Sequence, residues 1–159
     1  HQGWNWFAPI ANFDLEQLEQ DLGTNGISIN SQNQFARYDE DDDEWSGDLT
    51  ALVPGQMYKI QVSADCSFTL SGTPFASVIV NIEHGSNWFG YIGSEMTIEE
   101  AINVFTPAEG DKITSANGDF TIYEDNEWGG SLLNLEPGHG YIYISQDTET
   151  KQLTITRNH

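Results

Sequence analysis

The sequence predicts a mainly β fold made of two tandem homologous β-rich modules, each with one short helix, of small sandwich or barrel type and packed together. Three observations predict it: a long internal repeat, short runs in which apolar and polar residues alternate, and one amphipathic helical stripe in each copy. We place module 1 at residues 1–72 and module 2 at residues 73–159, because Gly72-Thr73-Pro74 is a turn-forming cluster between two apolar runs.

The internal repeat is clearest between DEWSGDLTALVPGQMY, residues 43–58, and NEWGGSLLNLEPGHGY, residues 126–141. Trp45 and Trp128 are 83 residues apart (128 − 45), and glycine, leucine, Pro-Gly and tyrosine positions follow in register. Upstream, Asn-Trp-Phe occurs at 5–7 and again at 87–89, with the offset drifting between 82 and 85. Each copy is near the size at which one core is barely sufficient, so we expect the modules to share an interface.

Each module is predicted to contain one helix. In module 2 the helix is predicted over TIEEAINVF, residues 97–105, where Thr97 and Glu100 form a capping box and apolar residues recur at helical spacing. In module 1 the predicted N-cap is Asp14. The apolar stripe that follows it consists of Leu15, Leu18 and Leu22.

The remaining patterns predict strands and tight turns. Asn117-Gly118 lies between two alternating runs and predicts a hairpin from Lys112 to Tyr123. The two Pro-Gly pairs, at 54–55 and 137–138, predict type II turns with positive φ at the glycine. In the matched strands MYKIQV and GYIYIS, polar residues at 59 and 61 become Ile142 and Ile144. This exchange indicates that the module 2 face is covered, with module 1 as the candidate cover.

Composition excludes several classes of partner. Five basic against 25 acidic residues give a net charge of −20, which repels nucleic-acid phosphates and anionic lipid surfaces. No apolar run approaches the length of a transmembrane helix. Cys66 is the only cysteine, so it forms no internal disulfide, and its alternating context suggests a small half-buried residue.

Module 2 carries a series of motifs nearly whole, as NWFGYI, GDKITS, FTIY, WGGSL and LEPGHGY. The series resembles a tandem repeat module of bacterial secreted or cell-surface multidomain proteins. Module 1 departs from it at Asn25-Gly26-Ile27 and at Gln56-Met57-Tyr58, and the two modules together cover nearly the whole chain. The resemblance implies an extracellular or cell-surface location, neighbouring domains in a larger chain, and an accessory role in binding polysaccharide. It supplies no catalytic residues.

The repeated tryptophans are either core residues or ligand platforms. Trp6 and Trp88 lie between apolar neighbours and recur unchanged, which favours burial in the core. Trp45 and Trp128 each follow an acidic turn and precede a small residue, a setting that suits either a buried or an exposed ring. Trp4 is replaced by Ser86 in module 2, and a core position would not accept that exchange, so we expect its ring to be exposed.

Exposed indole rings can stack on the C–H face of a sugar while neighbouring amides orient its hydroxyls. The leading hypothesis is therefore a non-catalytic, extracellular carbohydrate-binding module. The alternative is a structural or adhesive spacer that makes protein contacts. No nucleophile elbow, phosphate loop or zinc motif is present, so an enzyme is not expected. The candidate ligand-binding residues are Trp4, Trp45, Trp128, Asn5 and Asn126.

The acidic run DEDDDEW, residues 39–45, suggests a cation site as one interpretation. Asp39, Asp41 and Asp43 supply the oxygen ligands that Ca²⁺ prefers, although the spacing is not that of an EF-hand. The other interpretation is a solvated acidic loop, which is the usual state of adjacent like charges. The expected cofactor is therefore none, or calcium.

Overall fold

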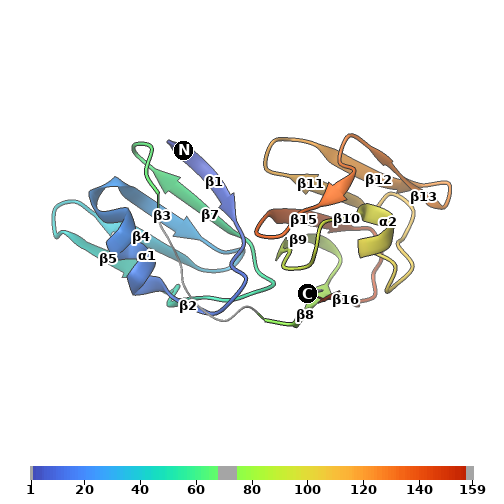
Figure 1. Cartoon of the computed structure of the whole chain (residues 1–159), viewed down its shortest axis with the longest axis horizontal. Helices are drawn as coiled ribbons and strands as arrows, with labels where there is room; N and C mark the ends of the chain where they lie inside the picture. The colour runs from blue at the N-terminus through green and yellow to red at the C-terminus, as the bar shows by residue number, and fades with distance from the viewer. Residues whose placement is uncertain (1, 68–74, 157–159) are drawn as a thin grey trace.

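The computed structural model describes residues 2–67 and 75–156, and within them the fold is mainly β, as predicted (Figure 1). The main feature is a pair of five-stranded antiparallel sheets, one formed within residues 3–62 and one within residues 85–145. Each sheet is open, because its two end strands pair with only one neighbour each in the part of the chain described. The barrel form is therefore not adopted. The predicted boundary at 72–74 lies outside the described residues.

The first sheet is formed by five strands from residues 3–62, the part of the chain that contains the first copy of the repeated stretch. Its inner face is covered by helix α1 (Leu15–Leu22) and by the short pair β2 (Phe13–Asp14) and β6 (Ala51–Leu52). The 3₁₀ turn η1 (Gly23–Asn25) connects α1 to the next strand. In spatial order its strands are β1 (Gly3–Phe7), β7 (Tyr58–Val62), β3 (Gly26–Asn30), β4 (Phe35–Asp39) and β5 (Glu44–Gly47).

The second sheet has the same arrangement of strands as the first. In both, the first strand in sequence lies at one edge, the last strand lies beside it, and the second, third and fourth strands follow. Helix α2 (Ile98–Ala101), the short pair β10 (Met96–Thr97) and β14 (Asn134–Leu135), and the longer pair β8 (Ser77–Ile82) and β16 (Lys151–Thr156) accompany it. In spatial order its strands are β9 (Gly85–Gly90), β15 (Gly140–Ser145), β11 (Lys112–Ser115), β12 (Phe120–Glu124) and β13 (Glu127–Gly130).

Each sheet covers its own hydrophobic core. In the first, the three leucines of α1 pack with Ile29 of β3 and with alternate residues of β7, because side chains on one face of a strand recur at every second position. In the second, Ile98 and Ile102 pack on β11 and β15 together with Ile82, Leu153 and Ile155 from β8 and β16. Cys66 is half-buried beside the first core, as expected.

The predicted helix caps are confirmed. The Asp14 carboxylate accepts a hydrogen bond of 3.1 Å from the Glu16 amide, and Thr97 and Glu100 form both bonds of a capping box. However, α2 ends at Ala101 rather than at 105. Asn103 and the β-branched Val104 have low helix propensity, and a proline at 107 opposes further helix.

The predicted turns are also confirmed. Gly55 and Gly138 have φ of +88° and +82°, which a type II turn requires after proline. Strands β11 and β12 pair as the predicted hairpin. Each Pro-Gly turn is tied to the following tyrosine: Tyr58 accepts from the Val53 amide at 2.9 Å, and Tyr141 from the Glu136 amide at 2.8 Å. The repeated tyrosine therefore holds the loop that precedes its own strand.

Candidate ligand-binding site

The two sheets meet through backbone hydrogen bonds that run in both directions. The Ala8 amide donates to the Gly138 carbonyl at 3.2 Å, and the Gly90 amide donates to the Gly55 carbonyl at 2.9 Å. Ala8 matches Gly90 in the repeat, and Gly55 matches Gly138. The same contact is thus made once by each half.

Small residues allow the close approach of the two halves. A Cβ on Gly140 would lie 1.9 Å from Cγ of Met57, which is fully buried. A Cβ on Gly90 would lie 2.3 Å from the Gln56 carbonyl oxygen and 2.7 Å from the Ala8 methyl group. The contact surface therefore leaves no room for larger residues at these positions.

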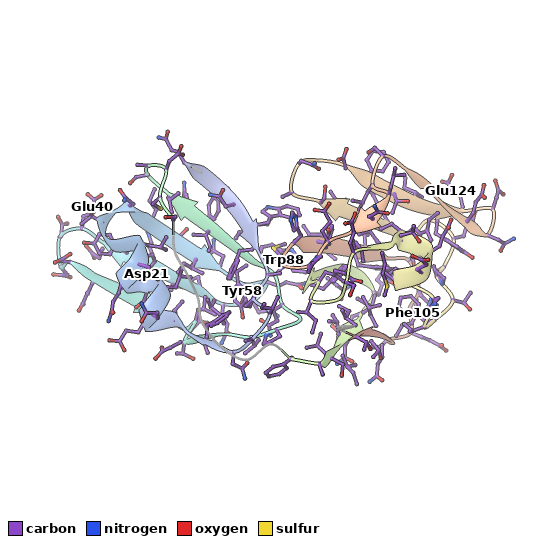
Figure 2. The ribbon with its side chains drawn as sticks, viewed as in Figure 1. Asp21, Glu40, Tyr58, Trp88, Phe105 and Glu124 are labelled. Carbon is purple, nitrogen blue, oxygen red and sulfur yellow. The ribbon has the colours of Figure 1, made fainter. Side chains whose placement is uncertain are left out.

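Trp6 and Trp88 both lie against Lys59 at this junction and not in a core. Figure 2 shows Trp88 between the two sheets. Both tryptophans are half-buried, so the prediction that they are core residues is wrong. The cause is their place in the sheets: each is on an edge strand, with its side chain on the face opposite the core residue Phe7 or Phe89. The Lys59 ammonium group lies 4.8 Å from the Trp6 ring centre and 4.3 Å from that of Trp88.

The predicted cover over the outer face of the second sheet is only partial. Ile142 and Ile144 are half-buried, and Ile142 pairs with Trp88 in the ladder between β15 and β9. Trp88 in turn contacts Lys59 of the first sheet. Ile142 and Ile144, the apolar residues that replace Lys59 and Gln61, therefore lie next to the junction and are only partly covered.

Gln32 forms a further bridge across the junction. Its Nε2 donates to the Ser86 carbonyl at 2.7 Å, and its Oε1 accepts from the Trp88 amide at 2.8 Å. Gln32 belongs to the turn between β3 and β4, whereas Ser86 and Trp88 belong to β9, an edge strand of the second sheet. One side-chain amide thus satisfies two backbone groups at the free edge of that strand.

A cavity of about 430 Å³ also opens at the junction. Its lining combines Trp6 of the first sheet with residues of the β11–β12 turn and of the segment between β13 and β15. Leu133, with 70% of its surface exposed, lies at this cavity. The polar residues that line the cavity are Ser115, Asn117, Asp119, Ser131, Asn134, Glu136, His139 and Tyr141.

Several of these polar groups are held in place by neighbours. Asn134 donates to Glu95 at 3.1 Å, and the His139 Nε2 lies 3.3 Å from a Glu136 carboxylate oxygen. The Asn117 side-chain oxygen accepts from the Asp119 amide at 3.0 Å. Burial raises the pKa of Tyr141, which also lines the cavity, to about 12, so its hydroxyl is neutral at physiological pH. The lining therefore offers both hydrogen-bond donors and acceptors beside an indole ring.

Of the residues predicted to bind ligand, Trp4 and Asn5 lie beside Trp6 on β1. Trp4 is 52% exposed, as expected, and its side chain is on the same face as that of Trp6. Asn5 is half-buried and donates to the Gly3 carbonyl at 3.3 Å. The matching Asn87 is buried and bonds to Glu83, Gly85 and Tyr143, a structural role at the start of β9.

The other predicted residues lie at the far edges of the two sheets. Trp45 is half-buried, with its ring centre 5.7 Å from that of Tyr38, and Trp128 lies 5.3 Å from Tyr123 in the same way. Both pack against the core of their own half. Asn126 has φ of +67° in the two-residue turn between β12 and β13, which is ordinary hairpin chemistry for asparagine. The predicted set is therefore not one site.

The acidic loop is organised by its own hydrogen bonds. Asp39 accepts from the amides of Asp41 and Asp42 at 2.9 and 3.4 Å, and Asp43 accepts from the Tyr38 hydroxyl. This hydrogen bond raises the pKa of Tyr38. Within residues 2–67 and 75–156, no three His, Cys, Asp or Glu side chains are grouped so that they could hold a metal ion. Calcium binding by Asp39, Asp41 and Asp43 stays a prediction.

Sequence reasoning missed the role of Trp6 at the cavity, and only its invariance in the repeat could have drawn attention to it.

None of the described helices has the length and apolar character needed to span a membrane. Comparisons with protein-family models, with curated proteins and with solved structures give no match.

Proposed function

We propose that the chain consists of two copies of one β module, residues 1–72 and 73–159, packed about a local two-fold axis. The identical order of strands in the two sheets supports this proposal. So do the reciprocal bonds of Ala8 and Gly90, and the contact between Met57 and Gly140. Met57 and Gly140 match in the repeat, and matching residues touch each other only near a two-fold axis.

The proposed function of this pair is non-catalytic carbohydrate binding outside the cell. The observation that carries the proposal is the junction cavity, in which the Trp6 ring faces a wall of amide, carboxylate and imidazole groups. Its volume of about 430 Å³ lies within the roughly 300–1,000 Å³ typical of small-molecule sites. An indole beside convergent polar groups suits a sugar, because the ring takes the C–H face and the polar groups take the hydroxyls.

The charge of the site favours a neutral glycan. Asp119 and Glu136 line the cavity, and the whole chain carries a net charge of −20. The nearby cation, Lys59, already lies between two tryptophan rings. A uronic acid or a sulfated sugar would therefore meet like charge, whereas an uncharged polysaccharide would not.

Affinity electrophoresis tests the proposal, with soluble β-glucan, xylan and mannan as neutral polysaccharides and polygalacturonate as the acidic one. We expect retardation by at least one neutral polysaccharide and none by polygalacturonate. Asn134→Ala removes an amide of the cavity lining, and Trp4→Ala removes the exposed ring next to Trp6 on β1, so each should weaken retardation. The loss of a stacking ring is worth about 1–3 kcal/mol, by analogy with bases on aromatic side chains. Phe35→Ala is the matched control, because Phe35 is also exposed but is on β4, away from the cavity.

Absence of retardation by every neutral polysaccharide would contradict the proposal. It would favour the second candidate, a structural or adhesive spacer that makes protein contacts. The observation that supports a spacer is the close packing of one part of the junction, where Gly90 and Gly140 lie against residues of the first half and Met57 is fully buried. A spacer needs that stiffness and needs no cavity.

A further inference from the structure

The position in the second half that matches Gln32 carries no side-chain amide. Ser31 and Ser115 begin turns at matching places in the repeat: the Ser31 amide donates to the Gln34 carbonyl three residues on, and the Ser115 amide to the Asp119 carbonyl four residues on, both at 2.9 Å. The second turn is therefore one residue longer than the first. The residue after the serine is Gln32 in the first half and Ala116 in the second. Ala116 lines the cavity beside Trp6 and has no amide to place there.

The backbone of β1 at Trp4 and Trp6 corresponds to the backbone of β9 at Ser86 and Trp88, to which Gln32 bonds. Trp4 and Trp6 pair with Gln61 and Lys59 in the β1–β7 ladder, as Ser86 and Trp88 pair with Ile144 and Ile142 in the β9–β15 ladder. The Ser86 carbonyl and the Trp88 amide point away from β15, because Gln32 binds them from the outer side. By the same register, the Trp4 carbonyl and the Trp6 amide point away from β7, at the open edge of the first sheet.

We infer that the edge of β1 is a sugar subsite, in which two adjacent ligand hydroxyls take the place of the missing side-chain amide. One hydroxyl donates to the Trp4 carbonyl and the other accepts from the Trp6 amide, which repeats the pattern of the Gln32 amide. Vicinal hydroxyls suit this pattern, because each of them can donate and accept. The sugar ring then lies on the Trp6 indole. This inference rests on the proposed function and names the groups that recognise the ligand.

The subsite also explains why exposed Trp4 is on the same strand. Trp4 and Trp6 are two residues apart and share one face of β1, so their Cα atoms are about 6.8 Å apart along the strand and their side chains leave it on the same side. A linear oligosaccharide that runs along β1 would meet both rings in turn. The matching residue in the second half is Ser86, whose carbonyl Gln32 already occupies. The open edge and the extra ring thus occur together in the first half only.

Ala116→Gln is the variant that tests the subsite, because it supplies the amide that the first half provides at Gln32. Ala116→Ser is the matched control, since a hydroxymethyl group is too short to reach β1. The probes are hexasaccharides of β-1,4-linked glucose, xylose and mannose, titrated into the full chain by calorimetry. The same titrations are followed by the ¹⁵N–¹H signals of the Trp6 and Trp88 amides.

We expect Ala116→Gln to weaken binding of the preferred hexasaccharide at least tenfold without lowering the melting temperature, and Ala116→Ser to leave binding within twofold of the wild type. The Trp6 amide signal should shift on titration of the wild type, whereas the Trp88 signal, already bonded to Gln32, should not. Binding by the wild type without a Trp6 shift would overturn the subsite and leave the proposed function in place. Binding of no hexasaccharide and no polysaccharide would overturn both.

Discussion

Trp6 and Trp88 both lie against one ammonium group, that of Lys59, although the two rings belong to different sheets. The distances from the nitrogen to the ring centres are 4.8 and 4.3 Å, within the range of a cation–π interaction. Each such contact contributes about 0.5–2 kcal/mol, depending on how far it is removed from water. Lys59 therefore connects the two halves through the faces of matching residues.

Lys59→Met should lower the free energy of unfolding by about 1–2 kcal/mol, because methionine keeps most of the side-chain volume and loses the charge. Urea denaturation followed by tryptophan fluorescence measures the change. Lys59→Arg is the control, since arginine keeps both the charge and the ability to stack. Equal stability of the methionine variant and the wild type would show that the ammonium contributes only packing.

Gly140→Ala should destabilise the chain by about 1–3 kcal/mol, because the added methyl group overlaps Met57 at the junction. Adding Met57→Ala should recover part of that loss, since the two residues share one space. Gly129→Ala is the control, as a Cβ at Gly129 meets nothing within 4 Å. Thermal denaturation of the wild type, the two single variants Gly140→Ala and Met57→Ala, and the double variant gives the coupling, and strict additivity would contradict the contact.

Asp111→Asn should cost about 2–4 kcal/mol of stability. Asp111 is fully buried, and its oxygens accept from the Tyr143 hydroxyl at 2.6 Å and from the amides of Ala108 and Gln146 at 3.0 and 2.7 Å. An asparagine would turn an N–H toward one of these donors and leave it unpaired. Chemical denaturation measures the effect, with the exposed Glu124→Gln as control. A loss below about 0.5 kcal/mol would mean that the site admits water.

Trp4→Ala and Trp128→Ala should separate clearly in a thermal melt. Trp4 is exposed, so its removal should change stability by less than about 0.5 kcal/mol. Trp128 packs on Tyr123 and Tyr143, with ring centres 5.3 and 6.1 Å away, so its removal should cost about 2–4 kcal/mol. A larger loss of stability for Trp4→Ala than for Trp128→Ala would contradict the placing of Trp4 on the surface and of Trp128 against the core.

Stability should fall as the pH rises from about 10 to about 12. Burial raises the pKa of Tyr141 from 10.0 to about 12, so the unfolded chain loses this proton at lower pH than the folded chain does. The stabilisation is complete below pH 10 and is lost as the pH rises through the folded pKa. Tyr141→Phe should flatten this decline in melting temperature, and an unchanged slope would assign the effect to Tyr58 and Tyr143, whose pKa values burial also raises.

Local rules were sufficient to predict the turns and caps from the sequence alone. Asp14, Thr97, Gly55 and Gly138 depend on one or two neighbours in the chain, and they occupy the predicted positions. The exposure of Trp4 was also predictable, because its replacement by Ser86 in the repeat is incompatible with a core.

The tertiary structure decided what the repeated tryptophans do. Trp45 and Trp128 pack beside tyrosines against their own cores, whereas Trp6 and Trp88 meet across the junction. Gln32 contacts a strand more than 50 residues away, and neither helical periodicity nor strand alternation encodes which edges of two sheets will meet. Ala116 lines the cavity, whereas Gln32 follows the matching serine in the first half, and the effect of that difference depends on which strand edge lies opposite each turn.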